Sequence, residues 1–375
     1  MEEYINKDGK RLRLGYTTGT CAAAASRAAA RALLTGVCPE KITIKTPKGI
    51  SVELRIIEIR RDENSVTCAV KKDSGDDPDI TNGIYIHAKV MYRDAPGIEI
   101  DGGEGIGRVT KRGLDRPVGD AAINTAPRRQ ITDNLTEACR ALDYGGGLSV
   151  VITAPEGGRI AKKTFNPRLG IEGGISILGT SGIVEPMSEA ALIETIRLEL
   201  SQRRGNGRKY ILFIPGNYGL EYIKGMGFDA NDAVVTSNFI GASVDMASDA
   251  GFSGVLIVGH IGKLVKLAGG MFDTHSKYGD CRMEIIAAHA AAAGLSRTGI
   301  SKILNSATCD AALDILKENE ICEETLSRII SRIEFHLNAR AAGRIEAGAL
   351  LFSRRHGFLS ETRNARALLE KITKE

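Results

Sequence analysis

Glycine is concentrated in four segments of this 375-residue chain, and these segments constrain its fold more than any other feature. Thirty of the 43 glycines lie in residues 97–113, 145–182, 205–227 and 241–279. Glycine tolerates positive φ and lets the backbone pass close to other groups. Clusters of this kind are typical of turns between short elements, and several in one chain also indicate a binding surface built from loops.

The first half of the chain has the pattern of an α+β domain. An Ala-rich segment after Thr17 predicts a helix that begins near Thr18–Thr20 and ends at Gly36. A second helix is expected over 131–143, capped by Thr132 or Asp133. Alternating apolar and polar residues predict strands at 41–46, 50–60, 64–71, 84–92, 148–154 and 174–178. The acidic loop 73–79 is interpreted as a solvated turn, with a cation site as the weaker alternative.

The pattern changes from Ser188, where helical segments alternate with short apolar runs. This alternation is typical of β-α-β units and of a parallel sheet. Helices are expected at 188–202, 283–293 and 309–350, and strands at 210–214, 233–236 and 254–258. We therefore predict two domains, an α+β domain over 1–185 and an α/β domain with a mostly parallel sheet over 186–375.

Composition and charge exclude several classes of protein. The net charge of +4 and an aromatic content of 5% argue against a general nucleic-acid binder. The seven cysteines form no Cys-x-x-Cys pair, so no metal site and no disulfide framework is predicted. The start of the chain does not resemble a secretory signal, and there is no continuous apolar segment of about 18 residues. We expect a cytoplasmic protein with no membrane span, and a homo-oligomer stays open.

Two glycine motifs resemble known phosphate-binding loops and fail the test of context. Residues 101–107 follow an apolar run, but no helix of useful length follows them, so a dinucleotide fingerprint is rejected. We expect a flexible, exposed loop flanked by cations there. Residues 259–264 lack the spacing of a Walker motif. They do follow a strand, as do 179–182 and 215–219, and ligands bind at the carboxyl ends of parallel strands.

Histidines and arginines supply the candidate polar groups. His260 and His275 lie in the last glycine cluster and are the leading general acid/base candidates, with a structural role as the alternative for each. Residues 108–129 carry six Lys or Arg against two Asp. Such a segment suits a ligand with several carboxylates, and the amino end of the helix at Thr17–Thr20 is another position that favours an anion.

Taken in order, seven segments resemble the cobalt-precorrin-5B (C1)-methyltransferase family of anaerobic cobalamin biosynthesis. They are residues 14–25, 102–110, 122–124, 127–129, 179–184, 215–217 and 259–276. The resemblance implies a transferase that moves a methyl group from S-adenosylmethionine to C1 of cobalt-precorrin-5B, giving cobalt-precorrin-6A. Cobalt would then arrive only as part of the substrate, a corrinoid polycarboxylate. A non-catalytic corrinoid carrier is the alternative function, and a kinase or oxidoreductase is disfavoured by the failed motif tests.

The site hypothesis combines the glycine loops, the strand ends and the cations. His260 and His275 are the candidate catalytic residues. The residues expected to bind S-adenosylmethionine are Gly179, Thr180, Ser181, Gly182, Gly216, Asn217, Gly259, Gly262 and Lys263. The residues expected to bind the substrate are Thr17, Thr18, Thr20, Gly103, Gly105, Gly107, Arg108, Arg128, Arg129, Thr274 and Ser276.

Overall fold

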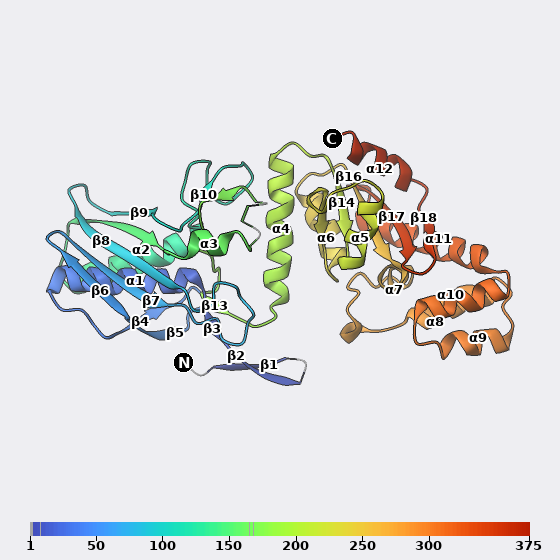
Figure 1. The fold of residues 1–375 in the computed structure, drawn as a ribbon, viewed down its shortest axis with the longest axis horizontal. Helices are drawn as coiled ribbons and strands as arrows, with labels where there is room; N and C mark the ends of the chain where they lie inside the picture. The colour runs from blue at the N-terminus through green and yellow to red at the C-terminus, as the bar shows by residue number, and fades with distance from the viewer. Residues whose placement is uncertain (1–2, 8, 165, 168) are drawn as a thin grey trace. The chain divides into compact units, whose positions relative to one another are not determined.

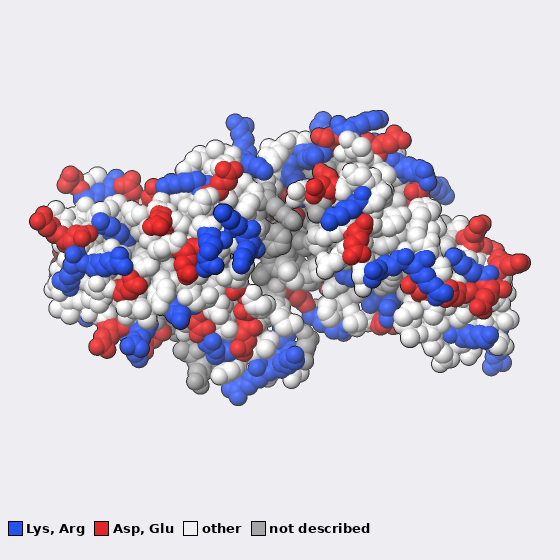
Figure 2. Space-filling model, in the orientation of Figure 1, with Lys and Arg blue, Asp and Glu red and all other residues white. Residues whose placement is uncertain are grey.

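A computed structural model describes residues 3–7, 9–164, 166–167 and 169–375 of the chain. The chain divides into two compact units, Met1–Glu189 and Ala190–Glu375 (Figure 1). The first combines a mixed sheet with helices, and the second has a mostly parallel sheet. Both predicted fold classes are therefore confirmed. Basic and acidic side chains are interspersed over the drawn face of each unit (Figure 2).

The first unit is built on a five-stranded sheet in the order β6-β7-β8-β11-β9, in which β9 and β11 are parallel and the other pairs are antiparallel. Its elements are β1 (Tyr4–Lys7), β2 (Lys10–Arg13), β3 (Gly15–Tyr16), α1 (Thr18–Thr35), β4 (Lys41–Lys45), β5 (Ser51–Arg55), β6 (Glu58–Asp62), β7 (Ser65–Lys71), β8 (Tyr85–Arg93), β9 (Ile98–Gly102), β10 (Arg108–Val109), α2 (Thr125–Ala141), β11 (Gly147–Thr153), α3 (Gly157–Ala161), β12 (Ile171–Glu172) and β13 (Ile183–Val184).

Helix α1 is the centre of this unit, and its predicted bounds are confirmed. The Thr17 hydroxyl accepts a hydrogen bond from the backbone N–H of Thr20 at 3.2 Å, which caps the first turn. Gly36 ends the helix in the left-handed conformation at φ 75°. The alanines of α1 are almost fully buried because their small side chains let α2 and strands β7 and β8 approach closely.

Three of the predicted helices and strands of the first unit need correction. Helix α2 begins at Thr125 and not near 131, because Pro127 lies in the first turn, where the missing N–H of proline has no helical partner to lose. The expected strand 50–60 is two strands, β5 and β6. The expected strand 174–178 contributes isolated bridges at Ile175 and Ile177.

The loop that follows β9 is packed, so the prediction of a flexible, exposed loop is wrong. Ile106 is 4% exposed, and the backbone N–H of Ile175 donates to the carbonyl of Gly105 at 2.9 Å. A Cβ on Gly105, which has φ 74°, would lie 1.7 Å from the carbonyl oxygen of Ala154. Glycine is therefore required here by the close approach of neighbouring backbone segments.

Two aspartates of the acidic loop 73–79 form ion pairs with residues of the first unit. Asp73 receives two hydrogen bonds from the guanidinium of Arg13, at 2.5 and 2.8 Å. Asp79 accepts from the buried ammonium of Lys72 at 2.6 Å. Two of the four carboxylates of this loop are therefore paired with cations of the first unit.

The second unit is a three-layer arrangement, with helices on both faces of the sheet. Its elements are α4 (Glu189–Gly205, whose first residue belongs to the other unit), β14 (Tyr210–Ile214), α5 (Asn217–Gly225), β15 (Ala233–Val235), α6 (Ile240–Asp249), β16 (Gly254–His260), α7 (Ile261–Leu264), α8 (Arg282–Ala292), α9 (Arg297–Leu304), α10 (Cys309–Glu318), α11 (Cys322–Ala341), β17 (Glu346–Ser353), β18 (Gly357–Glu361) and α12 (Ala365–Thr373).

Successive residues of the central strands point into two different cores. Phe213 and Ile257 pack with α6, α8 and α11, whereas Leu212 and Leu256 pack with α5 and α12. A strand buried on both faces has no alternation of polar and apolar residues. This explains the continuous apolar runs by which these strands were predicted.

The expected helix over 309–350 is wrong at its end. Helices α10 and α11 occupy 309–341, but Glu346–Ser353 forms strand β17, which pairs in parallel with β16. The strand contains Ala, Gly and Leu, residues that carry little β-preference, and its burial on both faces removes the period of two. Strand β18 then adds an antiparallel edge to the sheet.

Among the helices of the described residues, none has the length and apolar character needed to cross a bilayer.

Candidate functional site

The order of strands in the second unit creates a natural ligand position. The sheet runs β15-β14-β16-β17-β18, so the chain leaves β14 toward one side to form β15 and then crosses to the other side to form β16. The loops after β14 and β16 therefore diverge at the carboxyl ends of adjacent parallel strands. In open α/β sheets, ligands bind in the crevice at such a switch point.

A cavity of about 1070 Å³ lies at this position. We call it the switch-point cavity. Segments that follow four neighbouring strands line it, together with Arg282 and the start of α10. Its lining residues are Pro215, Gly216, Asn217, Tyr218, Gly219, Val235, Ser237, Gly259, His260, Gly262, Lys263, Arg282, Thr308, Cys309, Asp310, Arg354 and Arg355.

Gly216 and helix α5 form one wall of the switch-point cavity. Gly216 has φ 147° and ψ 171°, a conformation that side chains disfavour, and it precedes the first residue of α5. A Cβ at this position would lie 3.6 Å from Nζ of Lys263. Glycine therefore keeps open the space between the start of α5 and the Lys263 ammonium.

Lys263 is the half-buried cation of this wall. Its Nζ donates to Oδ1 of Asn238 at 2.8 Å and lies 3.4 Å from the carbonyl oxygen of Ser237. Burial lowers the pKa of Lys263 from its usual value. An anion beside Nζ would restore the stability of the charged form.

His260 ends strand β16 and caps the turn that follows. Its Nδ1 accepts a hydrogen bond from the backbone N–H of Gly262 at 3.0 Å. Burial lowers the pKa of His260, so the neutral imidazole is favoured. Because Nδ1 already accepts a hydrogen bond, the proton of that neutral ring lies on Nε2, which can donate.

The cavity lining also includes an acid, an arginine and aromatic rings. The carboxylate of Asp310, in the first turn of α10, accepts a hydrogen bond from the buried hydroxyl of Ser353 at 2.5 Å. The guanidinium of Arg354 lies over the ring of Tyr218, 4.7 Å from its centroid. The Tyr218 ring in turn lies 5.8 Å from that of His260.

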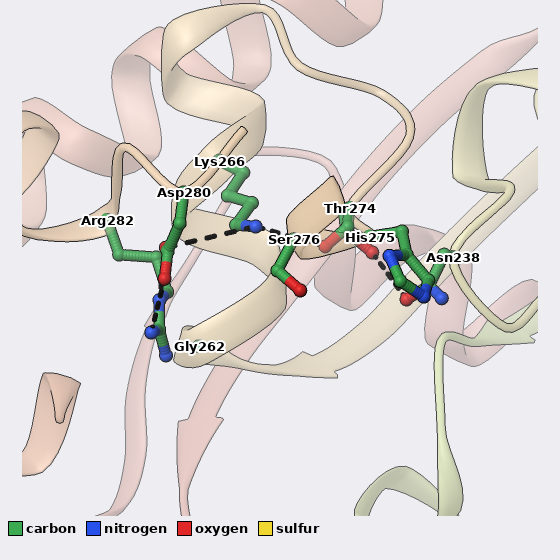
Figure 3. Close-up of a pocket in the computed structure, with 8 residues that line it drawn as sticks. All are labelled: Asn238, Gly262, Lys266, Thr274, His275, Ser276, Asp280 and Arg282. Carbon is green, nitrogen blue, oxygen red and sulfur yellow. Dashed lines mark hydrogen bonds and ion pairs between the residues drawn. The ribbon is translucent and has the colours of Figure 1, made fainter. Parts of the chain in front are cut away.

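A second, smaller cavity of about 350 Å³ adjoins the first, and Gly262 and Arg282 line both. We call it the polar cavity. Figure 3 shows the residues that line it, which come from the loop after β15, the turn after β16, the loop before α8 and the first residue of α8. They are Asn238, Gly262, Lys266, Thr274, His275, Ser276, Asp280 and Arg282. His275 is exposed, and its Nδ1 accepts from the backbone N–H of Lys277, which caps a single 3₁₀ turn over Ser276–Tyr278.

The predicted threonines at the start of α1 contact the predicted loop 179–182 within the first unit. Thr18 and Thr20 hold the loop 178–182: the Thr18 hydroxyl accepts from the Leu178 N–H at 2.9 Å, and the Thr20 hydroxyl donates to the Gly182 carbonyl at 2.7 Å. A Cβ on Gly179 would lie 2.3 Å from the hydroxyl oxygen of Thr17. Thr17–Thr20 and Gly179–Gly182 are thus brought together, with Thr180 and Ser181 on the same loop.

Three predicted arginines of the first unit differ in their contacts. Arg108 forms two hydrogen bonds with Asp101, at 2.8 and 2.9 Å. Arg128 donates to the carbonyl oxygens of Ile123 and Ile100, at 2.9 and 2.7 Å. Arg129 is 83% exposed and has one long contact of 3.8 Å, to Asp133. Arg129 therefore has a guanidinium that is open to a ligand.

The predicted glycines of the central motif serve the fold through their backbone. Gly103 donates to the carbonyl of Ile152, and Gly107 donates to that of Ile175. A Cβ on Gly107 would lie 2.4 Å from the side chain of Ile171. Together with Gly105, these glycines let the loop after β9 pack against the end of β11 and the backbone near Ile175.

The structure thus brings together the predicted residues Gly216, Asn217, Gly259, His260, Gly262 and Lys263 in the switch-point cavity, with Thr274, His275 and Ser276 in the polar cavity. Residues 179–182 belong to the other unit.

Several lining residues were missed by sequence reasoning. Ser237 and Asn238 follow a strand that was predicted, so the rule of strand ends would have found them. Arg354 follows β17, which was expected to be helical. Lys266 lies within the family-like segment 259–276 but was not singled out, and Arg282 carries no signal in its local sequence.

The described residues contain no group of three or more His, Cys, Asp or Glu side chains placed to hold a metal ion.

Comparison with known proteins covers both units. Residues 5–186 match the CbiD family, and residues 273–363 match the family described as CbiD, C-terminal domain. A cobalt-precorrin-5B C(1)-methyltransferase of Ruminiclostridium cellulolyticum is 49% identical, over 94% of this chain and 92% of that protein. One of Alkaliphilus metalliredigens is 45% identical, over 100% of this chain and 99% of that protein. A 1.9 Å crystal structure of a cobalamin biosynthesis protein (CbiD) from Archaeoglobus fulgidus is 30% identical, covers 77% of this chain and 88% of that chain, and has a TM-score of 0.40.

Proposed function

Because this chain belongs to the CbiD family of cobalt-precorrin-5B C(1)-methyltransferases, we propose that its switch-point cavity holds the methyl donor and that this donor is S-adenosylmethionine. The activity of the chain is methyl transfer to C1 of cobalt-precorrin-5B in cobalamin biosynthesis, which confirms the function predicted from the sequence. The observation that carries the proposal is the cavity of about 1070 Å³ at the point where β14 and β16 diverge.

The groups around the switch-point cavity fit the parts of this methyl donor. Its volume is slightly above the range of roughly 300–1,000 Å³ that is typical of small-molecule sites. The ammonium of Lys263 and the start of α5 favour a carboxylate, since both present positive charge. Ser237 and Asp310 offer oxygen atoms to ribose hydroxyls and to an ammonium group, and Tyr218 offers an aromatic face at the rim.

Gly216 is the position at which the fit is most direct. Its backbone opens the space in front of Lys263, which a side chain would occupy. A carboxylate in that space would lie close to Nζ and to the N–H groups of the first turn of α5. We place the methionine carboxylate of S-adenosylmethionine there.

S-adenosylmethionine, when bound, supplies a methyl group on a positively charged sulfur. Transfer of that group is an in-line displacement, so alignment of the two reactants provides much of the rate. The rigid strand ends of β14 and β16 supply fixed positions for such alignment. Neutral His260 would act as a positioning residue that donates from Nε2, because protonation of Nδ1 would break its hydrogen bond with Gly262.

The other predicted residues take part in the proposal as follows. The substrate is a cobalt-containing polycarboxylate, and its cobalt enters with it. Arg129 is proposed to meet a substrate carboxylate because its guanidinium is exposed. Arg108 and Arg128 are proposed to stabilise the first unit, since their hydrogen bonds are formed within it.

Replacement of Lys263 tests the position of the methyl donor. We expect Lys263→Met to weaken the binding of S-adenosylmethionine about tenfold, because a charge-assisted hydrogen bond to its carboxylate is lost. The measurement is calorimetric titration of the full chain. Lys224→Met is the matched control: Lys224 lies in the last turn of α5, is exposed and does not line the cavity.

Two results would contradict the proposal. If Lys263→Met and Lys224→Met bind S-adenosylmethionine as the unaltered chain does, the methyl donor is not held at Lys263. If the unaltered chain binds no S-adenosylmethionine with cobalt-precorrin-5B present, another methyl donor is used.

A further inference from the structure

The polar cavity beside the switch-point cavity has a buried cation in its wall. Lys266 is 2% exposed, and its Nζ donates to the carbonyl oxygens of Thr274 and Gly279, at 3.1 and 2.8 Å. An ammonium has three N–H donors. The remaining one has a long contact of 3.9 Å, to the carboxylate of Asp280. In Figure 3 the Lys266 ammonium lies between Asp280 and Ser276.

The carboxylate of Asp280 is already committed to an arginine. Its Oδ1 accepts from Nε of Arg282 at 2.6 Å, and its Oδ2 accepts from Nη2 at 2.7 Å. This pairing lowers the pKa of Asp280, so the carboxylate stays charged and its charge is offset. With Lys266 included, two positive groups face one negative group here.

The other polar groups of this cavity have unused hydrogen-bond donors. Oδ1 of Asn238 accepts from Lys263 and from the hydroxyl of Thr274, at 2.8 and 3.2 Å, which leaves the amide N–H groups of Asn238 for a ligand. The hydroxyl of Ser276 has no hydrogen-bond partner among the described residues. Arg282 retains N–H groups beyond the two bound to Asp280.

Because the polar cavity has unused hydrogen-bond donors and a net positive charge, it favours an anionic ligand that accepts hydrogen bonds. We propose that the polar cavity binds a carboxylate side chain of the corrinoid substrate, through Lys266, Ser276 and Arg282. The inference rests on the proposed function, because Gly262 and Arg282 line both cavities and so join this site to that of the methyl donor. Substrate bound here has one of its carboxylates fixed beside the position of the methyl group.

Two substitutions test this site in the full chain under anaerobic conditions, with cobalt-precorrin-5B and S-adenosylmethionine as probes. Arg282→Gln removes a guanidinium, and Ser276→Ala removes a hydroxyl that no described residue binds. We expect Arg282→Gln to raise the KM for cobalt-precorrin-5B about tenfold, with a smaller rise for Ser276→Ala. Ser276→Thr keeps the hydroxyl and should restore the KM.

The controls separate this inference from the proposed function. Arg328→Gln is the matched control, because Arg328 also donates through Nε and Nη2 to a carboxylate, that of Glu324, on the exposed side of α11. It should leave the KM unchanged. Binding of S-adenosylmethionine should be unchanged in Ser276→Ala, because Ser276 lines the polar cavity and not the switch-point cavity, whereas Lys263→Met weakens it.

The outcomes are distinct. A higher KM for cobalt-precorrin-5B with unchanged binding of S-adenosylmethionine supports the carboxylate site. An unchanged KM in both variants overturns it, and so does weaker binding of S-adenosylmethionine with an unchanged KM, which would assign the cavity to the methyl donor. If Lys263→Met does not weaken the binding of S-adenosylmethionine, the proposed position of the methyl donor is wrong. The carboxylate site is then tested separately by the KM of Arg282→Gln and Ser276→Ala for cobalt-precorrin-5B.

Discussion

His260 has two structural functions, since it ends strand β16 and its side chain caps α7, whose Gly262 lines both cavities. The sequence predicted an acid/base role from its position in a glycine cluster. The structure shows Nδ1 engaged by the N–H of Gly262 and a pKa lowered by burial. The neutral His260 ring holds the turn at Gly262 in place through Nδ1 and presents an N–H at Nε2. The hydrogen bond at Nδ1 requires the neutral form of the ring.

The lowered pKa of His260 predicts a specific pH dependence of stability. Unfolded histidine has a pKa of about 6.5. Because the folded value is lower, the unfolded chain takes up a proton first as the pH falls, and the free energy of unfolding decreases. The contribution is complete above about pH 6.5 and is lost as the pH falls from there through the folded-state pKa.

Comparison with His260→Asn isolates this contribution. Asparagine can accept the Gly262 N–H but does not titrate. We expect the difference in free energy of unfolding between the unaltered chain and His260→Asn, measured with urea from pH 5 to 8, to shrink on acidification. All other histidines cancel in this difference. A difference that is constant or grows at low pH would show that His260 is not held in its neutral form.

The role of a single residue can be predicted from the sequence where its hydrogen-bond partner is only a few positions away. Thr17 and Gly36 are recognised as helix caps because capping involves residues a few positions away. Arg128 could not be interpreted in this way, because one of its partners is the carbonyl of Ile100, far away in the sequence. Arg128 and Arg129 are adjacent and look alike in the sequence, yet the Arg128 guanidinium is hydrogen-bonded to backbone carbonyls and that of Arg129 is exposed.

Among the elements, the loop after β9 shows what a glycine motif can mean. Its glycines let three backbone segments touch, and the sequence cannot distinguish this from a ligand-binding loop. Gly105 has φ 74° and no room for a Cβ, whereas Gly119 has φ 96° and open space around it. The two positions therefore share the conformational requirement and differ in the steric one.

Alanine at these two positions separates the two costs. We expect Gly119→Ala to lower the free energy of unfolding by about 1 kcal/mol, from positive φ alone. Gly105→Ala should cost at least about 2 kcal/mol more, because its Cβ would overlap the Ala154 carbonyl. Urea denaturation of the full chain measures both. Equal losses would mean that the loop moves aside and is not packed as described.

Strand β17 shows the main failure of prediction at the same scale. Its sequence of small and apolar residues follows a helix and lacks a strand period, so only its parallel pairing with β16 identifies it. That error hid Arg354 and Arg355, which lie beyond its carboxyl end and line the switch-point cavity. Strands β14 and β16 were found, and with them the loops that carry most of the candidate site.

For the molecule as a whole, each unit has a hydrophobic core of its own. One core gathers helix α1 and the sheet of the first unit, and two others cover the faces of the parallel sheet of the second. The fold class of both units was predictable because alternation of element types is visible in sequence. All residues that line the switch-point and polar cavities belong to Ala190–Glu375.

Binding of S-adenosylmethionine to each unit expressed alone tests the central claim most directly. We expect residues 190–375 to fold cooperatively and to bind S-adenosylmethionine in calorimetric titration with an affinity within about tenfold of the full chain. Residues 1–189 should not bind it, and Lys263→Met in the fragment should weaken binding as in the full chain. Binding by residues 1–189, or by the full chain alone although residues 190–375 are folded, would contradict the assignment of the methyl donor to the switch-point cavity.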